Sequence, residues 1–284
     1  MGYQLYFLYN SKKRGKSRNR NKKEIIDEIN EFHKYGGKEV VLTGVNVSAW
    51  GASNTRNSKE SKFSHLLRDI LNYTNIPRIR ISSISPEFLD DYFFDVIENK
   101  RIMPFFHFSV QSFSDKVLKN MNRNYTSCEL IEKIETIRSL KRDDKDLINL
   151  GADIIVGFPQ ETYEDFLITY NMLEKYFFTN MHIFPFSSHI KGDSVPASLY
   201  KGKIDDSIKN QREKKLFNLS EINQKKFKKI NKGKKLNVLF EYQKKGTWYG
   251  WSENYIQIKK LLMMICQENC KRLFLNNYYF LQFV

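Results

Sequence analysis

The stretch Glu39-Val40-Val41-Leu42-Thr43-Gly44-Val45-Asn46 decides the fold of this 284-residue chain. Three consecutive apolar residues that end in a turn of Thr, Gly and Asn are typical of a short buried strand. The residues before it, 22–35, carry Ile and Phe at helical spacing, and Gly36-Gly37 ends that helix. A helix that leads into a buried strand is the repeating unit of parallel α/β proteins.

The same alternation recurs four times toward the carboxyl terminus. Helical spacing is found at 63–71, 86–97, 128–140 and 163–176, and apolar strands at 78–81, 105–108, 152–156 and 181–184. Strands that alternate with helices pair in parallel. These five repeats, with one more strand expected at the N-terminus, predict an α/β fold built as a partial (β/α) barrel.

The pattern changes after residue 204. Residues 205–232 have the composition of a long charged helix, while 236–241 and 255–258 alternate like strands around a hairpin marked by Gly246 and Gly250. We therefore expect a partial barrel at 1–204, a charged helical linker at 205–232, a small and incomplete β module at 233–260, and an atypical tail without strand alternation at 261–284.

The chain is basic, with 47 Lys and Arg against 32 Asp and Glu and a net charge of +15. This charge favours a polyanionic partner such as nucleic acid, although a gene with AT-rich codons would also be rich in lysine. No apolar run approaches 20 residues, and the short apolar start precedes its basic residues rather than following them. A cytoplasmic monomer without a membrane segment is expected. The candidate RNA contacts are Arg14, Lys16, Arg18 and Arg20.

The chain has three cysteines, Cys128, Cys266 and Cys270, and this small, odd number argues against a disulfide framework. Polar residues at strand ends are more informative, because functional groups of parallel α/β folds gather at the carboxyl ends of the strands. Each has a simpler explanation: Gly44 makes a turn, Asp153 satisfies backbone N–H groups, and His107 is a hydrogen-bonded core residue. Polar or glycine-containing turns nevertheless occur at four strand ends in register, which favours a site: 43–46, 82–86, His107 with Gln111-Ser112, and 157–159.

Five blocks of sequence carry a family resemblance: Leu42–Asn46, Arg80–Pro86, His107–Ser112, Met121–Tyr125 and Asp153–Thr162. In order and spacing, from about residue 14 to residue 258, the chain resembles the tRNA methylthiotransferases of the radical S-adenosylmethionine (SAM) superfamily. Within them it is most similar to the group that modifies threonylcarbamoyladenosine. Residues 250–256 resemble the opening of a TRAM domain, an RNA-binding β barrel, so the β module is expected to be TRAM-like.

The resemblance implies tRNA as partner, and SAM and a 4Fe–4S cluster as cofactors. The cluster cleaves SAM reductively, the resulting radical abstracts hydrogen from an adenosine ring carbon next to the anticodon, and a methylthio group is installed there. The residues that the resemblance assigns to the cofactor cavity are Gly44, Asn46, Ser82, Ser83, Gln111, Arg123 and Asp153.

Several positions depart from the family pattern. The three cluster cysteines align with Met1, Leu5 and Leu8, and a thioether and two alkyl groups do not replace thiolates on iron. We therefore expect this chain to bind no cluster and its first strand, 1–11, to be frayed. The family's N-terminal domain has no counterpart, and glycines of the family are replaced by Phe113 and Gln160. A truncated gene copy is expected, either completed by a separately encoded N-terminal fragment or reduced to a non-catalytic remnant that binds tRNA.

Overall fold

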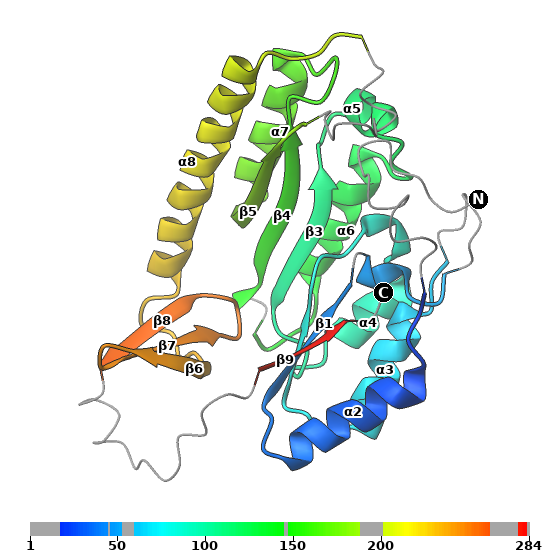
Figure 1. The fold of residues 1–284 in the computed structure, drawn as a ribbon, viewed down its shortest axis with the longest axis vertical. Helices are drawn as coiled ribbons and strands as arrows, with labels where there is room; N and C mark the ends of the chain where they lie inside the picture. Colours follow the sequence, from blue (N-terminus) through cyan, green and yellow to red (C-terminus); the bar gives the residue numbers. More distant parts are fainter. Residues whose placement is uncertain are drawn as a thin grey trace.

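Two parallel sheets form the centre of the molecule in the computed structural model, which describes residues 18–44, 46–52, 60–144, 147–187, 201–261 and 278–282 (Figure 1). The first sheet has the order β2-β1-β9 and the second the order β3-β4-β5. Single bridges from Ile79 to Ile102 and from Ile84 to Phe108 connect the two sheets. The strands are β1 (Glu39–Thr43), β2 (Arg78–Ile81), β3 (Phe105–Gln111), β4 (Asn149–Val156), β5 (Phe178–Pro185) and β9 (Tyr278–Gln282). The predicted open, partial barrel is confirmed.

Helices connect the strands in the alternation that the sequence predicts. The expected helix at 86–97 is divided into a short 3₁₀ turn and α4, because the Asp90 side chain accepts a hydrogen bond from Phe93 N and starts a new helix there. The helices are α2 (Lys22–Lys34), α3 (Phe63–Tyr73), α4 (Asp91–Ile97), α5 (Asp115–Asn120), α6 (Ser127–Ser139), α7 (Tyr163–Lys175) and α8 (Asp206–Ile230), with 3₁₀ turns at Val47–Ala49 and Pro86–Phe88. None of these helices has the length and apolar run needed to cross a bilayer.

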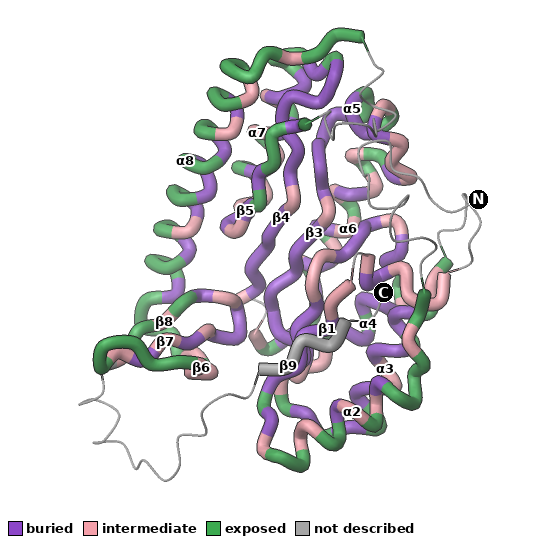
Figure 2. Tube along the Cα trace, in the orientation of Figure 1, coloured by how far each residue is buried: buried purple, intermediate pink, exposed green. Residues whose placement is uncertain are grey.

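The core lies between the sheets and the helices that cover them (Figure 2). Ile25 and Ile29 of α2 are fully buried, as their helical spacing predicts. Phe113, which stands where the related family has glycine, is 1% exposed and its ring meets that of Phe178 at 6.3 Å. This departure from the family pattern is therefore accommodated in the apolar core.

The segment expected as a charged linker, 205–232, contains α8, which lies against β5. Leu216 and Leu219 are buried, and polar side chains of α8 bond the backbone of β5. Ser220 Oγ donates to Thr179 O at 2.7 Å and Asn223 Nδ2 donates to Phe178 O at 2.8 Å. These contacts satisfy carbonyl groups near the start of the edge strand, so α8 closes this side of the partial barrel.

The β module is a separate antiparallel sheet of order β6-β7-β8, as predicted, with strands β6 (Val238–Lys244), β7 (Thr247–Ser252) and β8 (Gln257–Leu261).

In the tail, where the sequence predicted no strand pattern, Tyr278–Gln282 forms β9 and pairs in parallel with β1. A short strand at a sheet edge is specified mainly by the neighbour that accepts it, so its own pattern is weak. The expected frayed first strand, 1–11, lies outside the described residues.

A buried ion network joins the β module to the amino ends of β1 and β2. Glu39 is fully buried and accepts bonds from Arg78 Nε at 2.7 Å and from Arg80 Nε at 3.0 Å. Arg80 also donates to the carbonyls of Ser252 and Glu253 in the module. Burial by itself would raise the pKa of Glu39, but the two guanidinium groups outweigh burial and hold that pKa below its ordinary value.

Candidate functional site

Three polar side chains from neighbouring strands meet on one face of the second sheet. Asp153 of β4 accepts hydrogen bonds at Oδ1 from His107 Nε2 of β3, at 2.9 Å, and from His182 Nδ1 of β5, at 3.0 Å. The register explains the meeting, because Asp153 pairs with His182 across β4 and β5, and His107 pairs with Gly151 two residues before Asp153. Residues two apart on a strand point to the same face.

The second carboxylate oxygen is held by a hydroxyl. Ser83 Oγ donates to Asp153 Oδ2 at 2.8 Å and lies 2.7 Å from Ser109 Oγ. Burial by itself would raise the pKa of Asp153, but the bonds from His107, His182 and Ser83 outweigh burial and hold that pKa well below its usual range. The bond to Asp153 in turn raises the pKa of His182 above 6.5, against a smaller opposite effect of burial. The site therefore favours a carboxylate beside a protonated imidazole.

This cluster of His107, Asp153 and His182 opens to solvent on one side only. The side chains of His107 and Asp153 are 8% and 21% exposed, whereas that of His182 is 63% exposed. Phe184, two residues further along β5, is 52% exposed. Figure 2 shows the same gradient, since β3 and β4 are mostly buried and the carboxyl-terminal part of β5 is exposed.

Of the predicted cofactor residues, Gly44, Asn46, Ser82, Ser83 and Gln111 lie at or just after strand ends, whereas Asp153 lies inside β4 and Arg123 follows α5. Ser83 and Asp153 hydrogen-bond each other. Gly44 directly follows β1, and Asn46 Oδ1 accepts a bond from Ser48 Oγ at 2.8 Å. Ser82 N donates to Leu42 O, while its buried Oγ has no hydrogen-bond partner among the described residues.

Gln111 is the last residue of β3, and Arg123 lies between α5 and α6. Gln111 is buried at the end of the strand with a positive φ of 60°. The Arg123 guanidinium lies 5.9 Å from the centre of the Tyr125 ring, and the Tyr125 hydroxyl donates to Ser109 O at 2.7 Å. The turn between α5 and α6 is thereby fixed against the strand that provides His107.

Sequence reasoning identified 181–184 as a strand but did not select His182 as a site residue. The signal that could have identified His182 was its position as a histidine within an apolar strand, the next strand after the one that carries Asp153. Its distance in sequence from Asp153 concealed the contact, because strand register is not visible in local periodicity.

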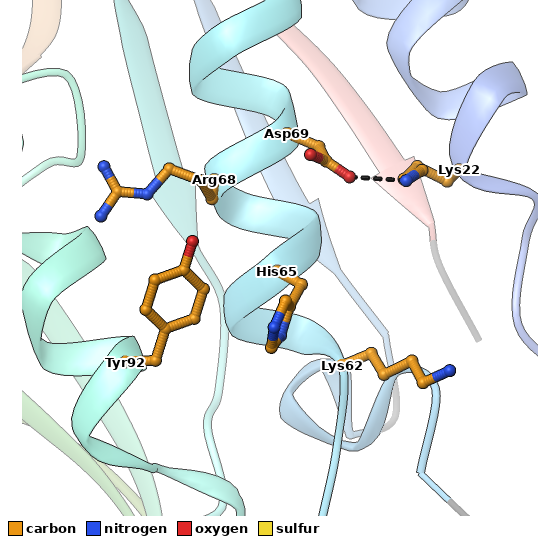
Figure 3. A pocket seen from close by; sticks show the side chains of 6 residues that line it. All are labelled: Lys22, Lys62, His65, Arg68, Asp69 and Tyr92. Carbon is orange, nitrogen blue, oxygen red and sulfur yellow. Dashed lines mark hydrogen bonds and ion pairs between the residues drawn. The ribbon is translucent and has the colours of Figure 1, made fainter.

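The predicted RNA-contact residues divide into two pairs. Arg14 and Lys16 lie outside the described residues, whereas Arg18 is exposed and Arg20 pairs with Glu28 at 2.8 Å. A surface hollow of about 350 Å³ is lined by six side chains from α2, α3, α4 and the residue before α3, and three of the six are basic (Figure 3). Arg68 lies over the Tyr92 ring at 5.5 Å, and Lys22 pairs with Asp69 at 2.6 Å. The complete lining is Lys22, Lys62, His65, Arg68, Asp69 and Tyr92.

Comparison with known proteins identifies the family. The model of the radical SAM superfamily matches residues 6–173, more than half of the chain. The chain belongs to the radical SAM superfamily. This radical SAM chain also resembles coproporphyrinogen III oxidase of Escherichia coli, a radical SAM enzyme, with a TM-score of 0.50 over 80% of this chain and 51% of that one, at 13% identity. That likeness concerns the fold alone.

Curated relatives are tRNA-modifying enzymes. The threonylcarbamoyladenosine tRNA methylthiotransferase MtaB of Treponema pallidum is 35% identical over 77% of this chain and 42% of its own length, and that of Bacillus subtilis is 31% identical over 86% and 53%. The tRNA-2-methylthio-N(6)-dimethylallyladenosine synthase of Aquifex aeolicus is 34% identical over 84% and 52%. The chain thus spans about half the length of these relatives.

Membership of the superfamily implies SAM and a 4Fe–4S cluster, and the residues present fit these two groups differently. The buried Oγ of Ser82 and the hydroxyls of Ser83 and Ser109 suit the polar groups of SAM. The positions that the family resemblance assigns to the cluster ligands, Met1, Leu5 and Leu8, lie outside the described residues, and their side chains contain no thiolate. Within the described part of the chain the free cysteine is Cys128, which is exposed on α6. The donor set of this chain therefore does not fit a cluster.

Proposed function

We propose that this chain is the radical SAM domain of a cytoplasmic tRNA methylthiotransferase that acts on N6-threonylcarbamoyladenosine next to the anticodon. The observation that carries the proposal is the identity of 31–35% to three relatives with that activity in their names, over 77–87% of this chain. The basic composition, with a net charge of +15, supports a tRNA partner.

In this function the face of the second sheet that carries His107, Asp153 and His182 would hold SAM and the substrate nucleoside. SAM, when bound, supplies the radical precursor and the methyl group. The chain's own residues have simpler roles: Gly44, Asn46, Ser82, Gln111 and Arg123 would bind and orient the polar groups of SAM. His107, His182 and Ser83 would keep Asp153 ionised and fixed, and Ser109 would orient the Ser83 hydroxyl. The thiolates for a cluster would come from outside residues 1–284, for example from a separately encoded N-terminal fragment.

A second function is a non-catalytic tRNA-binding protein, and the residues at Met1, Leu5 and Leu8 favour it. Anaerobic reconstitution with iron and sulfide separates the two, followed by analysis of both elements and of SAM cleavage. We expect neither a cluster nor cleavage for this chain alone. A stoichiometric cluster that cleaves SAM would establish the catalytic function without a second fragment.

Binding of a labelled anticodon stem-loop at increasing salt tests the tRNA partner. Because phosphate contacts release counterions, affinity should fall steeply as salt rises. The double variant Arg18→Ala/Arg20→Ala should weaken binding and flatten the salt dependence. Lys100→Ala, a charge change in the turn before β3, is the control and should have no effect. Absence of binding even at low salt would refute the tRNA function.

A further inference from the structure

We propose that His182 recognises the carboxylate of the threonylcarbamoyl substituent, and that it thereby selects which N6-modified adenosine the site accepts. The inference rests on the function proposed above and adds the residue that determines specificity. It starts from the one side chain of the cluster that is mostly exposed to solvent, that of His182.

The orientation of the His182 ring is fixed from behind. Nδ1 donates to Asp153 Oδ1 at 3.0 Å, and the ring lies 4.6 Å from that of His107. The other nitrogen, Nε2, has no hydrogen-bond partner within the described residues, and the side chain is 63% exposed. A donor held in one orientation loses less conformational entropy when it binds a ligand than a mobile lysine does.

The electrostatic environment favours an incoming anion at His182 despite the neighbouring carboxylate. Asp153 accepts bonds from His107, His182 and Ser83, so its charge is directed into the protein. The paired carboxylate stabilises the protonated form of His182, which leaves an N⁺–H group at the exposed side. An imidazolium that donates to a carboxylate forms a charge-assisted hydrogen bond, which is stronger than a neutral one.

An aromatic ring stands at a suitable distance for the base. Phe184 is two residues after His182 on β5, and residues two apart on a strand lie about 6.6 Å apart on one face. Its ring is 52% exposed. Exposed aromatic side chains stack nucleobases without strong base preference. A purine against Phe184 would therefore extend its N6 substituent along the strand toward His182.

This arrangement distinguishes the two substrates named among the relatives. The threonylcarbamoyl group of one carries a carboxylate, whereas the dimethylallyl group of the other is apolar. An apolar group placed against His182 would desolvate an imidazolium without replacing its hydrogen bond to water, which is unfavourable. A site built to hydrogen-bond a substrate group discriminates strongly against the analogue that lacks it.

The test measures binding of three versions of one labelled anticodon stem-loop, with threonylcarbamoyl, threonylcarbamoyl methyl ester or dimethylallyl at the same adenosine. The full chain should bind the free carboxylate about tenfold more tightly than the other two. In His182→Gln, which keeps a donor for Asp153 but has no charge, the three affinities should become equal. Phe184→Leu should weaken all three alike and keep the tenfold ratio.

The outcomes separate the inference from the proposed function. If none of the RNAs binds, the tRNA function is wrong and the inference falls with it. If all bind and the wild-type chain does not distinguish the ester from the free acid, only the inference is wrong. The ligand atoms of His107, Asp153 and His182 lie within 4.8 Å of one another, close enough to hold a metal ion. A preference that chelator abolishes would therefore assign recognition to a metal ion and overturn the role of His182.

Discussion

Replacing Glu39 by Gln should destabilise the protein strongly, because Glu39 is the buried anion between two arginines. Its Oε2 accepts from Arg78 Nε at 2.7 Å and from Arg80 Nη2 at 3.1 Å. A glutamine keeps one acceptor but presents an NH₂ group to donors. Two charge-assisted bonds are lost at about 1.5–3 kcal/mol each, and loss of one partner of a buried ion pair costs about 3–5 kcal/mol. We expect a loss of about 3–5 kcal/mol in the free energy of unfolding.

Urea denaturation and thermal melting measure this loss. For a domain of this size, 3–5 kcal/mol corresponds to a decrease in Tm on the order of 10 °C. The loss should be complete at neutral pH. The difference in stability between wild type and variant should disappear as the pH falls below 4.5 and passes the lowered pKa of Glu39, because the wild-type carboxylate then becomes neutral. Asp69→Asn, which breaks the exposed pair with Lys22, is the control and should change the Tm little. Equal small effects of the two variants would refute the reasoning.

Three further predictions concern single positions. Gln160→Gly should stabilise the protein by about 1 kcal/mol in urea denaturation, because Gln160 has a φ of 68°, which glycine adopts without strain; destabilisation would contradict this. Gly151→Ala should destabilise by about 2 kcal/mol and weaken RNA binding, since an added Cβ would lie 2.4 Å from His107 Nδ1; unchanged stability and binding would count against it. The preference for the carboxylate substrate should be complete below pH 6.5 and should be lost as the pH rises through the raised pKa of His182, whose ring faces Asp153 and His107. The ratio of the affinities for the acid and the ester, measured between about pH 6 and about pH 9, tests this. A constant ratio would exclude recognition by the imidazolium.

Local periodicity in the sequence was sufficient to predict most of the fold. The helical spacing of Ile25 and Ile29 and the apolar run Val40–Leu42 each fix which face is buried, because side-chain direction follows from the helix or strand repeat alone. The alternation of such segments then leaves few arrangements other than parallel sheets covered by helices. The position of Ser83 just after β2 follows from the same pattern, since a strand end is where the apolar run stops, whereas Asp153 is a polar residue inside the apolar strand β4.

The tertiary structure alone decided which polar groups meet. Asp153 and His182 are 29 residues apart, and they become neighbours only through the register of β4 against β5. Glu39 precedes an apolar strand like any surface charge, yet Arg78, Arg80 and the β module bury it completely. The partner of a charge and the exposure of a ring depend on segments distant in the chain, which local pattern does not encode. Hence the sequence predicted the fold and the edge of the sheet that bears the site, whereas the anion-recognising face of His182 emerged only from the packed strands.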